Sequence, residues 1–235
     1  MFNPIETIET VGIQSRIEIG DLGLIPAIKK TFGENLTQEQ RVEMVVAMDK
    51  FRNELERRGI NTPKNFETNL TNTSIETVDE FIDLPDLDKQ LKNGEGLEGF
   101  AHVVLKLVDL DGSIAIDAKP ANWVCNDDIT FIDFYPPTLN VGGNVEPFIQ
   151  QAYKRPQELF NFNYIDPRGQ ITKLLAGARF TYPDRLQDLE DIALACCVGT
   201  PYYEYIEEQI ANGYPDMNLF YGGDDEKAIN RLKQL

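Results

Sequence analysis

Four polar side chains between residues 114 and 135 have the types and spacing that phosphate chemistry requires. Asn122 lies five positions after Asp117, with Lys119 between them, and Asp133 lies sixteen positions after Asp117. Phosphoryl transfer needs oxygen ligands around Mg²⁺ and one carboxylate beside the attacking hydroxyl. The carboxylate, ammonium and amide groups of this segment can supply both requirements.

Two short apolar segments position these side chains. Residues 123–125 and 129–132 read as strands joined by a polar turn. Asp117, Lys119 and Asn122 fall in the loop before the first strand, and Asp133 ends the second. The pattern therefore predicts a loop and hairpin that can hold a nucleotide and its metal.

The order Asp-x-Lys-Pro-x-Asn, followed after the hairpin by Ile-Asp-Phe, resembles the catalytic loop and metal-binding Asp of the protein-kinase-like superfamily. The resemblance is closest to its small-molecule branch, the aminoglycoside and choline kinase-like phosphotransferases. It implies that Asp117 orients the acceptor hydroxyl and that Lys119 lies near the transferred phosphate. It also implies that Asn122 and Asp133 bind Mg²⁺, with ATP as the donor and a small hydroxylated molecule as the acceptor.

The segment departs from the family pattern at two places. Ala115 stands where a His often precedes the catalytic Asp, and Asp-Phe-Tyr-Pro-Pro replaces Asp-Phe-Gly from residue 133. Two prolines restrict the backbone, which argues against a long mobile activation segment. Either string alone is also ordinary turn chemistry, so the functional interpretation depends on their order and spacing together.

The composition indicates a soluble globular protein, and the length allows one large domain or two small lobes. The chain has 235 residues, 42% of them hydrophobic and 26% charged. A formal charge of −17 disfavours binding to nucleic acid and to anionic membranes. Three cysteines without metal-ligand spacing, and no apolar run near the ~18 residues of a membrane span, predict a cytoplasmic protein. The oligomeric state stays open.

Residues 7–32 alternate well enough for two or three antiparallel strands. The end of this segment, Ala27-Ile28-Lys29, resembles the kinase strand that presents the nucleotide-binding lysine. Ile28 and Lys29 face opposite sides of a strand, so placing Ile28 in the core favours Lys29 over Lys30 for this role. An exposed strand-end lysine is the alternative.

A capping box at Thr37 opens a predicted helix that continues to Gly59 with one apolar stripe. In the kinase-like interpretation an acid on this helix pairs with Lys29. Asp49 and Glu43 are the candidates, and a solvated helix face is the alternative for either residue.

Two further strands are predicted at residues 66–70 and 75–83. In the kinase-like interpretation the second is the hinge, where backbone groups of Glu80, Phe81 and Ile82 contact adenine. The lobe boundary then falls near residue 84. Residues 1–84 are the expected nucleotide-binding lobe, and residues 85–235 the expected catalytic and acceptor-binding lobe.

The rest of the chain reads as mainly helical. Helices are expected at residues 97–108, 148–160, 171–180, 184–198, 202–212 and 224–235, with a loop at 137–147. The predicted fold class is α+β: a protein-kinase-like two-lobed fold with a reduced β-rich N-lobe and a mainly helical C-lobe.

Three functions fit these patterns. The first is an ATP-dependent phosphotransferase that uses Asp117 as the base for a small hydroxylated acceptor. The second is a kinase-like module that binds nucleotide without turnover; the missing His favours it, but binding alone has no need for the Asp117 carboxylate. The third is a structural or partner-binding protein in which the motif is accidental.

Overall fold

The computed structural model describes residues 1–8, 14–126, 128–133, 138–141, 144–147, 156–221 and 225–235. The chain divides into two compact units: unit 1 comprises Met1–Leu84 and Thr130–Tyr153, and unit 2 comprises Pro85–Ile129 and Lys154–Leu235. The first division falls at the predicted lobe boundary. Residues 130–153 group with unit 1, however, so the chain after residue 85 is not the continuous unit that was expected.

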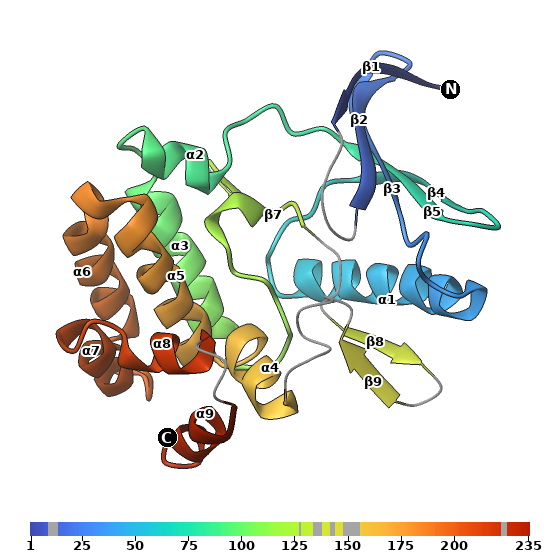
Figure 1. The fold of residues 1–235 in the computed structure, drawn as a ribbon. Coiled ribbons are helices and arrows are strands. Elements are labelled where there is room, and N and C mark those ends of the chain that lie inside the picture. Colours follow the sequence, from blue (N-terminus) through green and yellow to red (C-terminus); the bar gives the residue numbers. More distant parts are fainter. Residues whose placement is uncertain (9–13, 127, 134–137, 142–143, 148–155, 222–224) are drawn as a thin grey trace. The chain divides into compact units, whose positions relative to one another are not determined.

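Unit 1 contains a five-stranded antiparallel sheet with the order β1-β2-β3-β5-β4 (Figure 1). Its strands are β1 (Phe2–Ile8), β2 (Gln14–Leu22), β3 (Ile25–Phe32), β4 (Asn65–Leu70) and β5 (Ile75–Glu80). Gly23 joins β2 to β3 with a φ of 72°, a conformation that glycine adopts without steric cost. The antiparallel strands predicted for this part of the chain are confirmed.

Helix α1 (Gln38–Arg57) follows the sheet's third strand and begins at the predicted capping box. The Gln40 amide N–H donates to Thr37 Oγ1 over 3.2 Å, and the Thr37 amide N–H donates to Gln40 Oε1 over 3.0 Å. These two bonds satisfy amides that the first helical turn leaves without partners. The buried stripe consists of Met44, Met48, Phe51 and Leu55.

The short strand after residue 129 contributes to the core of unit 1. The Phe131 N–H donates to the Asn61 carbonyl over 2.8 Å. The Phe131 ring also packs edge-on against Phe51 of α1, with ring centroids 6.3 Å apart. These contacts explain why a segment distant in sequence groups with residues 1–84.

The hairpin predicted in the motif is present, and a second hairpin was missed. Strands β6 (Trp123–Cys125) and β7 (Ile129–Phe131) form a two-stranded sheet. Strands β8 (Thr138–Val141) and β9 (Asn144–Pro147) also pair, so the loop expected at residues 137–147 is wrong. Its two-residue Gly-Gly connection is a hairpin signal. The prediction for Phe134–Pro137 lies outside the described residues.

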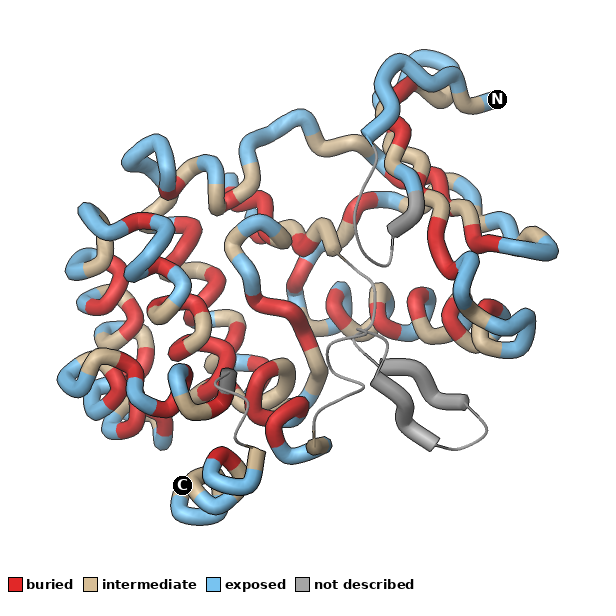
Figure 2. The backbone as a smooth tube through the Cα atoms, in the orientation of Figure 1, coloured by how far each residue is buried: buried red, intermediate tan, exposed pale blue. Residues whose placement is uncertain are grey.

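Unit 2 is helical, and its helices bury apolar stripes against one another (Figure 2). They are α2 (Leu87–Lys92), α3 (Leu97–Leu110), α4 (Gln157–Tyr164), α5 (Pro167–Thr181), α6 (Leu186–Cys197), α7 (Tyr203–Ala211), α8 (Pro215–Tyr221) and α9 (Asp225–Leu232). The predicted helix at 148–160 is wrong in its bounds, because α4 begins at Gln157 and residues 148–155 lie outside the described part. Helices α2 and α8 were not predicted.

The chain is therefore a mixed α and β protein with a small antiparallel sheet and many helices. Among the described residues, no helix combines the length and apolar character that crossing a membrane would take.

Candidate active site

Helix α5 anchors the segment that leads into Asp117. The Ile116 N–H donates to the Tyr164 carbonyl over 2.8 Å. Gln170 of α5, which is almost fully buried, donates its side-chain amide to both the Tyr164 carbonyl (2.6 Å) and the Ile116 carbonyl (3.3 Å). Buried amides with two such partners fix backbone position, so the start of the loop is set by the helix behind it.

The loop after Asp117 folds back on itself. Asn122 Nδ2 donates to the Asp117 carbonyl over 2.9 Å, and Trp123 Nε1 donates to the Ala118 carbonyl over 3.3 Å. A short 3-10 turn at Pro120–Asn122 makes this return possible. The Asn122 side-chain nitrogen donates to a backbone carbonyl. The side-chain oxygen Oδ1 is the acceptor atom that could bind a cation.

Two lysines hold the Asp117 carboxylate. Lys119 Nζ lies 2.8 Å from Oδ2, and Lys173 Nζ lies 3.1 Å from Oδ1. Asp117 is buried, and burial alone would raise its pKa, but the charges of Lys173 and Lys119 hold the pKa below its ordinary value. The carboxylate is therefore ionised at neutral pH, with both oxygens oriented.

Lys173 is a site residue that the sequence did not reveal. It lies on α5, and its ammonium sits 4.7 Å from the centre of the Tyr164 ring. Burial lowers its pKa, while Asp117 partly opposes this effect. Its 56-residue separation from Asp117 explains the omission, because no local motif links the two positions.

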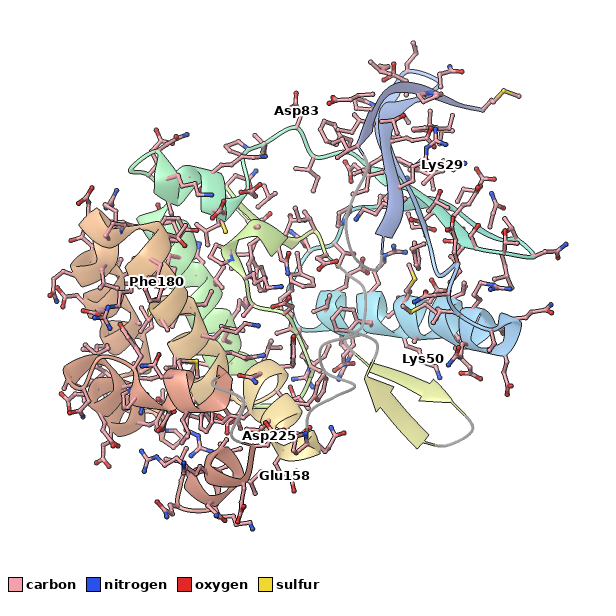
Figure 3. The ribbon with its side chains drawn as sticks, in the orientation of Figure 1. Lys29, Lys50, Asp83, Glu158, Phe180 and Asp225 are labelled. Atoms are coloured by element: carbon pink, nitrogen blue, oxygen red, sulfur yellow. The ribbon has the colours of Figure 1, made fainter. Side chains whose placement is uncertain are left out.

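In unit 1, the two adjacent lysines of β3 have different surroundings. Lys29 forms an ion pair with Glu76 of β5, Nζ to Oε2, over 3.0 Å (Figure 3 labels Lys29). Lys30 is buried and donates to the Ile132 carbonyl over 3.3 Å. Lys29 therefore lies on the face opposite Ile28, as predicted, and its role in nucleotide binding stays a prediction. Alternation places Lys30 on the same face of β3 as the fully buried Phe32.

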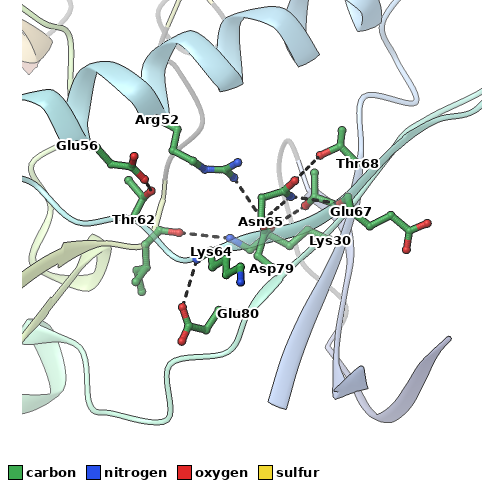
Figure 4. A network of polar contacts seen from close by, with 12 residues as sticks. Lys30, Arg52, Glu56, Thr62, Lys64, Asn65, Glu67, Thr68, Asp79 and Glu80 are labelled. Carbon is green, nitrogen blue, oxygen red and sulfur yellow. Dashed lines mark hydrogen bonds and ion pairs between the residues drawn. The ribbon is translucent and has the colours of Figure 1, made fainter. Parts of the chain in front are cut away.

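Asp79 of β5 forms the centre of a buried polar cluster near Lys30 (Figure 4). Its carboxylate accepts from Arg52 Nη2 (3.3 Å), Asn65 Nδ2 (2.8 Å) and Thr77 Oγ1 (2.9 Å). Burial lowers the pKa of Lys30, and the charges of Asp79 and Asp133 partly offset that lowering. Lys30 thus lies within the electrostatic reach of the predicted metal ligand Asp133.

Lys29 was expected to pair with an acid of α1, but its ion pair is with Glu76 of β5. Asp49 is exposed. The polar side chain that α1 directs to the sheet is Arg52, a base that binds the acid Asp79. The expected pair had a basic residue on the strand and an acidic residue on the helix. The observed pair has the acidic residue on the sheet and the basic residue on the helix.

The predicted adenine-binding segment follows β5. The Glu80 N–H donates to the Lys64 carbonyl over 2.8 Å, and the Phe81 N–H donates to the Pro26 carbonyl over 3.2 Å. These two amides are therefore already bonded within unit 1, and Ile82 follows them in sequence. A role for Glu80, Phe81 and Ile82 in adenine binding stays a prediction.

The structure thus brings Asp117, Lys119 and Asn122 together in unit 2, while Asp133 belongs to unit 1. No group of three or more His, Cys, Asp or Glu side chains suited to a metal occurs in the part of the chain that the structure describes. Mg²⁺ in nucleotide sites commonly takes one or two protein ligands and completes its shell with phosphate and water oxygens. An amide oxygen and a carboxylate fit that requirement.

Comparisons with known proteins give similarities to solved structures. No protein-family model and no curated protein sequence matches the chain. The structure is similar to the crystal structure of the Mycobacterium tuberculosis PknI kinase domain, with 12% sequence identity and a TM-score of 0.44. The alignment covers 89% of this chain and 95% of that chain. Residue roles in this protein follow from its own contacts.

Proposed function

We propose that the protein is an ATP-dependent phosphotransferase that moves the γ-phosphate to a hydroxyl group of a small molecule. The observation that carries the proposal is the Asp117 carboxylate, which is buried, ionised and held at both oxygens by Lys119 and Lys173. Maintaining a buried carboxylate in one orientation suits a group that must accept a hydrogen bond from an incoming hydroxyl.

The other residues of the loop have complementary roles in this proposal. Lys119, whose side chain is 59% exposed, can leave Asp117 and reach the transferred phosphate. Lys173 is 19% exposed and keeps the carboxylate oriented. We propose Asn122 and Asp133 as the protein ligands of Mg²⁺, which when bound would neutralise charge on the phosphates of ATP.

Lys30 replaces Lys29 as the proposed phosphate-binding lysine. Lys30 interacts with Asp133, the proposed metal ligand, whereas Lys29 is bound to Glu76. A lysine near the metal can contact phosphate oxygens that the metal also binds. The net charge of −17 further supports a small-molecule acceptor over nucleic acid.

Calorimetry with ATP and magnesium tests the proposal through Asp133→Asn. An amide cannot supply the negative charge that holds a hard dication, so we expect magnesium-dependent ATP affinity to fall by about 10-fold or more. Asp128→Asn is the matched control, because Asp128 lies on the exposed turn of the same hairpin. Undiminished affinity in Asp133→Asn would remove this residue from the metal site.

A product assay on the wild-type protein distinguishes an enzyme from a module that binds nucleotide without turnover. An enzyme forms ADP and a phosphorylated product when hydroxylated metabolites are supplied with ATP and magnesium. A binding module retains magnesium-dependent ATP affinity but forms no product with any acceptor, and that result would reject the phosphotransferase proposal.

A further inference from the structure

Two pockets of unit 2 adjoin one another beside Asp117. The first has a volume of about 310 Å³, and its wall includes Lys119 and Lys173, the two lysines that hold the Asp117 carboxylate. The second has a volume of about 520 Å³ and includes Arg179 and Phe180. Lys173 and Gly177 belong to both walls, so the pockets meet at the middle of α5.

The first pocket has the shape and lining of a site for a small carbon skeleton. Its apolar wall is made of small or compact residues, among them Ala118, Ala121 and Ala178. Asp88, which also lines it, is already bound by Lys92 over 2.7 Å and by the Tyr182 hydroxyl. Lys119 and Lys173 are therefore the polar groups of this pocket that lie nearest to Asp117.

Gly177 differs from the other glycines that the structure describes within helices of this unit. A Cβ on Gly99 would lie 2.6 Å from Cys125 Cβ, and a Cβ on Gly169 would lie 2.0 Å from the Phe162 carbonyl oxygen, so packing requires glycine at both. A Cβ on Gly177 would meet nothing within 4 Å. Glycine inside a helix costs about 1 kcal/mol relative to alanine. Gly177 is exposed, so the glycine leaves the helix surface shared by the two pocket walls without a side chain.

The charges around the pockets favour an anionic ligand. Asp117 offsets the charge of one of the two lysines, which leaves one positive charge in excess, and the Lys119 side chain is 59% exposed. Arg179 donates to the Gly213 carbonyl over 3.4 Å and forms no ion pair with any residue in the described ranges. Glu190 is not among the residues that line the second pocket, and it accepts from the hydroxyl of Tyr214, which does line it. Phe180, 83% exposed at the rim, adds an apolar surface beside the guanidinium.

We infer that the acceptor is a small alcohol that carries an anionic group, a carboxylate or a phosphate, and that Arg179 binds this group. The hydroxyl lies at Asp117 in the first pocket, the carbon skeleton crosses Gly177, and the anion occupies the second pocket. This inference rests on the proposed function and adds the acceptor class to it. Arg179 is then a specificity residue, and Gly177 provides the passage.

Calorimetry without nucleotide tests the binding step alone. The probes are 4-hydroxybutyrate for the carboxylate, glycerol 3-phosphate for the phosphate, 1,4-butanediol as a neutral alcohol and choline as a cationic alcohol. We expect one or both anionic probes to bind about 10-fold or more tightly than the neutral and cationic probes, the scale of hydrogen bonds to charged groups. Equal affinity across the panel, or no binding of either anion, would overturn the inference.

Two variants, each with a matched control, test whether Arg179 and Gly177 produce the preference for anionic probes. Arg179→Gln should remove the anion preference, whereas Arg185→Gln should keep it, because Arg185 likewise bonds a glycine carbonyl, that of Gly94, but lines neither pocket. Gly177→Leu should reduce anion affinity about 10-fold by closing the passage, while Gly177→Ala raises the melting temperature through its helix propensity. An unchanged preference in Arg179→Gln would overturn the assignment of Arg179.

Turnover with the same probes separates this inference from the proposed function. If anionic probes bind but no probe is phosphorylated, the phosphotransferase proposal fails and the anion site stands. If ATP and magnesium phosphorylate neutral or cationic alcohols as efficiently as anionic ones, the proposed function stands and the acceptor class is wrong.

Discussion

Each unit contains a buried aspartate that interacts with two basic side chains, yet the two arrangements are open to solvent to different extents. Asp79 in unit 1 is 0% exposed and receives bonds from Arg52, Asn65 and Thr77. Asp117 in unit 2 is also buried, but its partner Lys119 is largely exposed. A carboxylate whose partners are all internal stabilises structure. A carboxylate with one exposed partner can exchange that partner for a ligand.

The largest expected effect is on stability in the closed cluster. Asp79→Ala would remove the buried carboxylate that pairs with Arg52, whose side chain is 13% exposed, and loss of one member of a buried pair costs about 3–5 kcal/mol. Urea denaturation measures this change in the free energy of unfolding. Asp117→Ala is the comparison, expected to cost less because Lys119 can turn to water. Equal losses in the free energy of unfolding would show that the exposed partner of Asp117 does not make its loss less costly than that of Asp79.

The next effect is on catalysis in the open cluster. Asp117→Asn keeps the side-chain shape but removes the charge, so turnover should fall by about 10²-fold or more while ATP affinity stays within about 3-fold. Initial rates at saturating ATP and calorimetry measure the two quantities. A parallel loss of ATP affinity would place Asp117 at the nucleotide or its metal and not at the acceptor.

The two neighbouring lysines of β3 are compared by their effects on the KM for ATP. Lys30→Met should raise the KM for ATP by about 10-fold, whereas Lys29→Met should leave it nearly unchanged, because Lys30 interacts with Asp133 and Lys29 with Glu76. Steady-state kinetics at varied ATP concentration distinguishes them. Equal effects would contradict the assignment of Lys30 to the phosphates.

A smaller effect concerns pH. Burial lowers the pKa of Lys30 below 10.5, so the unfolded chain binds more protons than the folded chain between the folded pKa and that value. The wild type should therefore gain stability relative to Lys30→Met as pH rises through this window. Urea denaturation of both proteins from about pH 7 to about pH 10 measures the difference. A constant difference would mean that Lys30 does not titrate differently in the two states.

The sequence predicted those elements whose signals are local. The capping box at Thr37 located the start of α1, and the alternating residues before it located the strands. It placed Ile28 on the core face of β3 but did not predict that Lys30, on the same face, is buried. Ile28 and Lys30 share a face, and Lys30 lies inside because Asp79 and Asp133 compensate its charge, a tertiary effect that alternation cannot reveal.

The sequence likewise predicted the site residues that lie close together in the chain and missed those that lie far from them. The spacing of Asp117, Lys119 and Asn122 indicated a loop whose members meet, and their contacts agree with it. Lys173 and Gln170 were missed because α5 brings them to the loop from more than 45 residues away. A buried lysine or glutamine in a helix gives no signal in sequence beyond its presence among apolar neighbours.

The discontinuity of unit 1 has a consequence for how the chain matures during synthesis. Residues 1–84 leave the ribosome first, but the Phe131 ring that packs on Phe51, and the amide that bonds to Asn61, are made only after Pro85–Ile129 has been added. The sheet domain must wait for most of an intervening segment that belongs to the other unit. Contacts between residues so distant in sequence close late, so residues 1–84 expose the core face that Phe131 covers until the second segment of unit 1 has been made, and exposed apolar surface on a nascent chain is prone to aggregation.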